Sequence, residues 1–278
     1  MDTQVFDTVC AIFSFILGAM VGSFLNVCVY RIPKGESIVS PPSHCPKCDE
    51  PIAWYDNIPI LSWLVLGAKC RHCRVPISWQ YPTVEAITGA LFLVAYWRFG
   101  FVVATPVYML LLAGLVLVTF VDLTDWTIPD EVTLPGIFIG LACSVTAMFF
   151  PQTGLRIPYL YDGVFDALLG VLVGGGSLYL LDKLTLLLMK KRGMGFGDVK
   201  LNAMLGAFLG WKGVLLVIVT ASFVGSVIGL TMVAAQKIRG EDKVEHYLPF
   251  GPYLSIAGVI VLFFGPNLVE LYQAWLDI

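Results

Sequence analysis

The chain has 278 residues, of which 58% are hydrophobic and only 13% are charged, and its mean hydropathy is +0.82. Soluble domains carry about 25% charged residues, so this composition excludes an ordinary water-soluble protein and predicts an integral membrane protein. The net charge of −3 gives no reason to expect a nucleic-acid partner.

The first predicted membrane helix covers residues 8–30, which carry no charge. A spanning helix needs about 20 apolar residues, so this run is long enough to cross a bilayer. Its flank is acidic, with Asp2 and Asp7, and no clear small-residue cleavage site follows. We therefore interpret it as a retained anchor and not as a signal peptide.

The segment between the first and second predicted spans holds two closely spaced cysteine pairs. The pairs read C-P-K-C and C-R-H-C, and their members are Cys45, Cys48, Cys70 and Cys73. Two such pairs separated by 21 residues can bind one tetrahedral Zn²⁺ through four thiolates. We predict a structural zinc site, since four cysteine ligands leave no open position for water.

Disulfides and unbound thiols are the alternatives for these four cysteines. A cytoplasmic location, argued below, disfavours disulfides because that compartment is reducing. His44 and His72 neighbour the pairs, and either could substitute as a ligand. The loop is about 50 residues long with few large apolar residues, so metal binding would supply folding free energy that a small core cannot.

Further runs with few or no charges predict the remaining membrane helices. The uncharged runs of full length are 99–121, 132–155, 213–236 and 247–269. The weaker candidates are 83–97, 164–189 and the short run 199–211. Together with the first span they make about eight transmembrane helices, which predicts an all-α polytopic membrane protein with a zinc-knuckle loop.

Lysine and arginine gather in alternate loops, which gives the expected orientation. The basic loops are 31–81, 190–198 and 237–246. The opposite side carries only Arg98, Arg156 and Lys212. Because basic loops face the cytoplasm, the cysteine loop is expected on the cytoplasmic side and both termini on the outer side.

Two acidic residues stand at the cytoplasmic ends of predicted spans. Asp122 ends the third span, and Asp198 opens the short run 199–211. The uncharged part of that run, residues 201–211, is about 16 Å long, roughly half of the hydrocarbon thickness, so a crossing helix must draw Asp198 and Lys200 towards the bilayer. An ionisable group at such depth is costly and usually faces a functional cavity. Gly195 and Gly197 allow a tight turn and a close approach beside it.

Two carboxyl groups that meet at this membrane edge would suit aspartyl protease chemistry. A close pair shares one proton, so one carboxylate can take a proton from water while the other polarises the scissile carbonyl. The sequence has three histidines and neither G-x-S-x-G nor H-E-x-x-H. We predict Asp122 and Asp198 as the catalytic pair. From the residues alone, Asp125 and Asp130 could take the role given to Asp122. The alternative for both Asp122 and Asp198 is an ordinary acid in a cytoplasmic loop without a catalytic role.

Short motifs are spread along nearly the whole chain. They are G-S-F-L-N-V at 22–27, Y-R-I-P at 30–33, D-N-I-P-I-L-S-W at 56–63, Y-P-T-V-E at 81–85, G-F-G-D-V-K-L at 195–201 and P-F-G-P-Y-L at 249–254. These motifs resemble those of the bacterial type IV prepilin peptidases, which are G-x-G-D membrane proteases. The family pattern D-x₆-P-D matches Asp122 to Asp130. The resemblance implies Asp122 and Asp198 as catalytic residues, and we expect Gly195, Gly197 and Lys200 to support them.

The resemblance implies two activities in the bacterial inner membrane, with periplasmic termini and a cytoplasmic active site. Such an enzyme cleaves the basic leader of prepilins and type II secretion pseudopilins, then methylates the new N-terminal amine with S-adenosylmethionine. Related proteases that lack the cysteine loop also lack the methylase, which associates methyl transfer with this loop. The residues that bind the methyl donor stay unassigned, because the sequence has no G-x-G fingerprint.

The expected organisation has a first helix at 1–30, a cytoplasmic zinc loop at 31–82 and a seven-helix protease domain at 83–278. An intramembrane aspartyl protease without methylase activity is one alternative. A proton-coupled transporter that uses Asp122 and Asp198 as a relay is another. Internal repeats would favour transport, and we find none in the sequence.

Overall fold

The computed structural model describes residues 3–155, 157, 160, 163–190, 194–239 and 249–276. In these ranges the regular secondary structure is helical and strand-like pairing is limited to two isolated bridges, which confirms the predicted all-α class. The chain divides into two compact units, Met1–Val121 and Asp122–Ile278.

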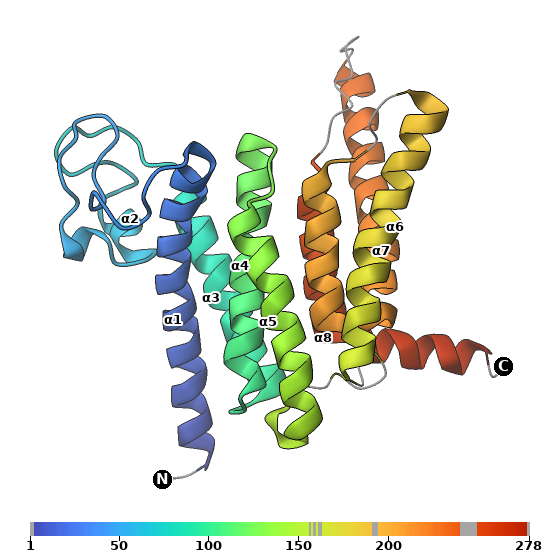
Figure 1. The fold of residues 1–278 in the computed structure, drawn as a ribbon. Helices are drawn as coiled ribbons and strands as arrows, with labels where there is room; N and C mark the ends of the chain where they lie inside the picture. The colour runs from blue at the N-terminus through green and yellow to red at the C-terminus, as the bar shows by residue number, and fades with distance from the viewer. Residues whose placement is uncertain are drawn as a thin grey trace. The chain divides into compact units, whose positions relative to one another are not determined.

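The first unit is built on a pair of helices, α1 (Thr3–Arg31) and α3 (Gln80–Phe99) (Figure 1). They approach closely because glycine stands at their crossing. A Cβ added at Gly22 would lie 2.7 Å from Glu85 Cα, so a larger residue would push the helices apart. The G-S-F-L-N-V motif is therefore first a packing motif, of the small-residue kind that membrane helices use.

The segment between α1 and α3 contains only short helices and forms a loop beside the C-terminal end of α1 (Figure 1). Its elements are η1 (Ile32–Lys34), η2 (Trp54–Asp56) and α2 (Leu61–Val65). The helix α4 (Ala104–Asp125) follows α3. The rings of Phe99 and Tyr108, 4.6 Å apart, pack together across this connection.

The second unit contains the remaining helices. These are α5 (Asp130–Phe149), the short η3 (Pro151–Thr153), α6 (Val164–Met189), α7 (Phe196–Arg239) and α8 (Gly251–Leu276). The helix α7 packs against α5, α6 and α8. Its first part is almost completely buried, as Leu201, Asn202 and Leu205 show. This buried stretch begins at Asp198, the last residue of the G-F-G-D motif.

Glycine also brings α6 and α7 together. A Cβ at Gly170 would lie 2.1 Å from the Gly206 carbonyl oxygen, and one at Gly174 would lie 2.5 Å from the Asn202 carbonyl oxygen. The Asn202 amide donates to the Gly174 carbonyl at 2.9 Å. Backbones this close leave no room for side chains, which explains why the faces that meet carry glycine.

A non-helical residue divides α7 near the predicted boundary between two spans. Gly210 has φ 70° and ψ 177°, a conformation that favours glycine. It lies one residue before the end of the predicted run 199–211, close to the start of the next run at residue 213. The first part of α7, residues 196–209, is thus about 20 Å long at 1.5 Å per residue, which is short of a full bilayer crossing.

Six helices in the described ranges are long and apolar enough to cross a membrane. They are Gln4–Lys34, Ala104–Asp125, Asp130–Phe149, Val164–Met189, Phe196–Ile238 and Gly251–Leu271. The weaker predicted span 83–97 corresponds to α3, and two predicted spans share α7, so the count of eight stays a prediction. The basic residues Arg156, Lys191, Arg192 and Lys243 lie outside the described residues.

Candidate active site and metal centre

Asp122 lies in the last turn of α4 and is buried, with 5% of its surface exposed. Its Oδ2 accepts a hydrogen bond of 3.0 Å from the backbone N–H of Gly251, the first residue of α8. A buried carboxyl requires such a partner, because leaving it unpaired is costly. The start of α8 therefore orients this acid.

Asp198 lies in the first turn of α7 and is 7% exposed. Its Oδ2 accepts the backbone N–H of Gly195 at 3.1 Å. Its Oδ1 is buried and has no hydrogen-bond partner among the described residues. One oxygen is therefore fixed by the G-x-G-D turn, while the other is available to a water or a substrate.

The side chain of Ile128 packs against residues that adjoin both aspartates. A Cβ at Gly197 would lie 2.7 Å from Ile128 Cβ, and one at Gly251 would lie 3.1 Å from Ile128 Cδ1. The residue next to Asp198 and the partner of Asp122 thus pack against one side chain. The two aspartates are also near enough for the negative charge of Asp122 to act on Asp198.

The structure places the competing acids in other contacts. Asp125 is exposed and accepts a hydrogen bond of 2.9 Å from the Thr124 hydroxyl. Asp130 forms an ion pair with Lys200 and is 52% exposed on its side chain. The geometry thus favours Asp122 over both, and it gives Lys200 a partner at the start of α5. The catalytic assignment itself stays a prediction.

The four predicted zinc ligands lie together in the loop of the first unit. Their Sγ atoms are all within 4.8 Å of one another, and those of Cys45 and Cys73 are 3.8 Å apart. Four thiolates in such a cluster match the donor set and spacing of a structural zinc site. The residues present therefore fit zinc.

The two cysteine pairs adopt nearly the same backbone turn. The N–H of Cys45 donates to the Glu50 carbonyl, and the N–H of Cys70 donates to the Val75 carbonyl, each at 2.9 Å. The residue after each pair has a positive φ, 56° at Asp49 and 59° at Arg74. The loop is thus two similar knuckles that face one metal position, a geometry that the cysteine spacing alone predicts only in outline.

Contacts within the cysteine cluster raise the pKa of Cys48 to about 12 and lower that of Cys70. Backbone N–H groups of Cys73 and His72 point to Cys70 Sγ and, with the neighbouring cysteines, lower the pKa of Cys70 to about 6. The thiolate is the form that binds metal. Beside it, the Arg71 guanidinium donates to both carboxyl oxygens of Asp56, through Nε at 2.6 Å and through Nη2, and this ion pair lowers the pKa of Asp56.

Two family models match the chain, one to each part of it. The bacterial peptidase A24 N-terminal domain matches residues 16–99, and the type IV leader peptidase family matches residues 109–230. The first range contains the cysteine cluster, and the second contains both aspartates.

Several curated proteins named prepilin leader peptidase/N-methyltransferase are similar to the chain. One from Xanthomonas campestris is 38% identical, and the match covers 92% of each chain. One from Pseudomonas aeruginosa is 34% identical, over 93% of this chain and 92% of the relative. One from Myxococcus xanthus is 42% identical over 83% of this chain and 65% of the relative. No solved structure matches the chain.

The chain belongs to the type IV leader peptidase family. That membership confirms the resemblance on which the predicted aspartates were chosen.

Three supporting features were not predicted from the sequence: the N–H of Gly251, the bridging side chain of Ile128 and a repeat within the loop. The repeat reads C-x-x-C-x-x-P-I-x-W at both 45–54 and 70–79, so the absence of internal repeats was too broad a statement. Gly251 lies in the motif P-F-G-P-Y-L, and this motif was the sequence signal that could have identified it.

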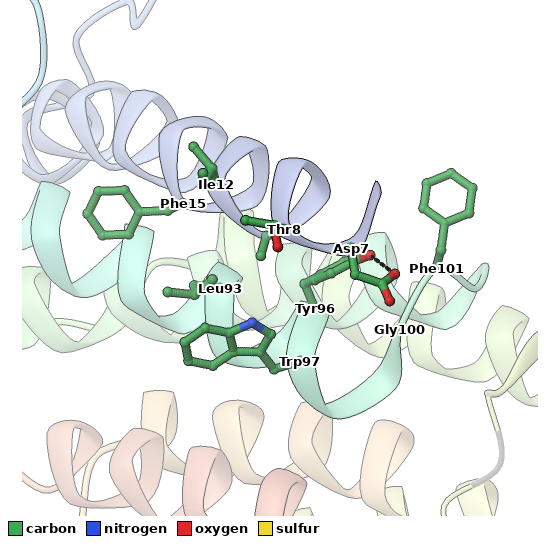
Figure 2. Close-up of a pocket in the computed structure, with 10 residues that line it drawn as sticks. Asp7, Thr8, Ile12, Phe15, Leu93, Tyr96, Trp97, Gly100 and Phe101 are labelled. Carbon is green, nitrogen blue, oxygen red and sulfur yellow. Dashed lines mark hydrogen bonds between the residues drawn. The ribbon is translucent and has the colours of Figure 1, made fainter. Parts of the chain in front are cut away.

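A cavity of about 600 Å³ lies in the first unit of this family member, at the end of the helix pair opposite the cysteine loop. Figure 2 shows its wall, where the Tyr96 hydroxyl donates to Asp7 at 3.3 Å beside Trp97. It lies between the N-terminal part of α1 and the C-terminal end of α3, whereas the cysteine loop joins the other ends of these helices. It contains no predicted catalytic or metal-binding residue.

Proposed function

We propose that this chain cleaves the leader peptide of type IV prepilins and type II secretion pseudopilins with Asp122 and Asp198, and then methylates the new N-terminal amine. The observation that carries the first activity is the pair of buried carboxyls, each held through one oxygen by a glycine N–H. The names of the relatives support both activities.

The two aspartates would act together on one water molecule. One carboxylate takes a proton from the water as its oxygen attacks the scissile carbonyl, and the protonated partner gives its proton to the carbonyl oxygen. Collapse of the tetrahedral species breaks the C–N bond, and the leaving amine receives a proton from the pair. The glycine N–H groups orient the carboxyls throughout, and the unpartnered Oδ1 of Asp198 is the oxygen that would face the water.

The membrane position suits a substrate with a basic leader and an apolar helix. In the proposed orientation the basic loops face the cytoplasm, both termini face the periplasm and the inner membrane holds the helices. The aspartates then lie at the cytoplasmic edge, where the junction between leader and helix would arrive. The exposed acids Asp125 and Glu131 near this site would attract the leader.

Methyl transfer is assigned to the cysteine loop, residues 31–82, and peptide cleavage to residues 83–278. S-adenosylmethionine is the proposed methyl donor. Cys45, Cys48, Cys70 and Cys73 would hold a Zn²⁺, which would cross-link the loop and leave no open position for catalysis. The metal is thus expected to support the shape of the loop, and the chemistry is left to other residues.

The test compares purified variants in detergent with a prepilin substrate. Asp122→Asn and Asp198→Asn should each lower the cleavage rate by at least about 100-fold, since each removes one proton-transfer group. Both should still methylate a pilin that has already been cleaved. Asp125→Asn is the matched control and should cleave normally. Normal cleavage by Asp122→Asn together with loss in Asp125→Asn would move the first catalytic role to Asp125.

A further inference from the structure

The backbone at Ile60 adopts a conformation that β-branched residues avoid. Its φ is 64° and its ψ is −51°. The Leu61 N–H donates to the Pro59 carbonyl at 2.6 Å, so Ile60 is the central residue of a strained γ-turn. Such a conformation persists only where the surroundings impose it.

Glu85 is the residue that imposes this turn. Its Oε2 accepts the Ile60 N–H at 2.7 Å, and its side chain lies on α3 with 7% exposed. The Ser23 side chain of α1 lies near the same carboxyl group. One buried side chain thus connects both helices of the pair to the loop. The Y-P-T-V-E motif, which the catalytic aspartates do not explain, ends at this residue.

The other end of the same segment is attached to the cysteine cluster. Asp56 is paired with Arg71, which stands between the two cysteines of the second knuckle. The stretch from Asp56 to Ile60 is therefore held at both ends. The knuckle holds one end, and the carboxyl of Glu85 on the helix pair holds the other.

Residues 57–59 of this stretch form one wall of a cavity of about 520 Å³ against α1. The volume lies in the range of small-molecule sites, which are mostly apolar with a few polar groups. The lining along α1 is mostly apolar and includes Phe24, and the polar groups are Ser23, Ser43, Asn57 and one charged side chain, Arg31, which could face the carboxylate of a ligand. Trp54 also lines the cavity, is 81% exposed and meets the Tyr55 ring in a T-shaped contact at 5.7 Å. Its indole could stack on a flat base.

We propose that this cavity binds the methyl donor, an adenosylmethionine-type molecule, and that Glu85 is the positioning residue that holds its wall. An adenine ring would stack on Trp54, and the polar groups of the donor would reach Ser43 and Asn57. Glu85 acts through Ile60 and does not touch the donor. The inference rests on the proposed function, in that it takes the cysteine loop as the methylase.

The test measures calorimetric binding of S-adenosylmethionine to the full-length protein and, with donor concentration varied, methylation of an already cleaved pilin. Glu85→Ala removes the acceptor and should raise both the Kd and the KM for the donor about tenfold or more. Glu85→Gln keeps an acceptor oxygen and should stay near the wild-type KM. Glu36→Ala, which alters an exposed acid of the same loop, is the control. Cleavage and zinc content should be unchanged in all three.

A second variant tests the cavity without altering the buried carboxyl. Asn57→Ala changes the wall directly and should also raise the donor KM. An unchanged donor KM in both Glu85→Ala and Asn57→Ala overturns the proposal, as does a loss in Glu85→Gln equal to that in Glu85→Ala.

Cys45→Ser separates this inference from the proposed function. If Cys45→Ser methylates normally, the assignment of methyl transfer to the cysteine loop fails. If Cys45→Ser loses methylation while Glu85→Ala retains a normal donor KM, only the role of Glu85 fails.

Discussion

One added methyl group at Gly251 should disable cleavage without unfolding the protein. A Cβ there would lie 2.5 Å from Asp122 Oδ2 and 3.1 Å from Ile128 Cδ1. Since even close carbon–oxygen contacts are about 3.3 Å long, the carboxyl would have to move by about 0.8 Å. A displacement of about 1 Å at a reacting group can cost about 100-fold in rate. We expect this loss in kcat/KM for prepilin cleavage by Gly251→Ala.

The backbone of Gly251 gives no separate reason for a defect. Its φ is not positive, and alanine is the better helix former. Cleavage time courses of Gly251→Ala should be compared with those of Gly176→Ala, where an added Cβ would meet no atom within 4 Å. Both variants should retain zinc and methylate a cleaved pilin. Cleavage by Gly251→Ala within about threefold of the wild type would refute the argument that Gly251 fixes the Asp122 carboxyl.

Two further outcomes follow from the ion pair and the cysteine cluster. Lys200→Met leaves Asp130 unpaired and should slow cleavage several-fold. Adding Asp130→Asn should recover part of this loss. A double variant that cleaves no faster than Lys200→Met would show that the two residues are not coupled. The protein should bind about one zinc per chain by metal analysis. Chelation should abolish methylation and restoration of zinc should recover it, while cleavage persists; cleavage lost in parallel would contradict a role confined to the loop.

The charge pattern of the sequence predicted the helices well because charges are excluded from apolar spans. The depth argument for Asp198 depended on the short run 199–211, and the interruption at Gly210 falls near its end. The end points were less accurate. The predicted span 132–155 ends in the structure at Phe149, since an uncharged run continues into a connection that contains Pro151.

The supporting contacts of the site were beyond sequence reasoning. Gly251 and Asp122 are 129 positions apart, and nothing in either segment specifies that a backbone N–H meets that carboxyl. Ile60 and Glu85 are 25 positions apart, and a positive φ at an isoleucine contradicts its local preference. The motifs P-F-G-P-Y-L and Y-P-T-V-E contain Gly251 and Glu85, but only the structure shows which contacts these residues make.

Each candidate centre is held by groups from its own compact unit. The glycine N–H groups that orient Asp122 and Asp198 come from Gly251 and Gly195, all within Asp122–Ile278. The cysteines, the Arg71–Asp56 pair and Glu85 all lie within Met1–Val121. Interactions between sites weaken when they share no partners. Loss of the metal should therefore leave the aspartate pair in place, and this is why cleavage without zinc is the outcome that the geometry requires.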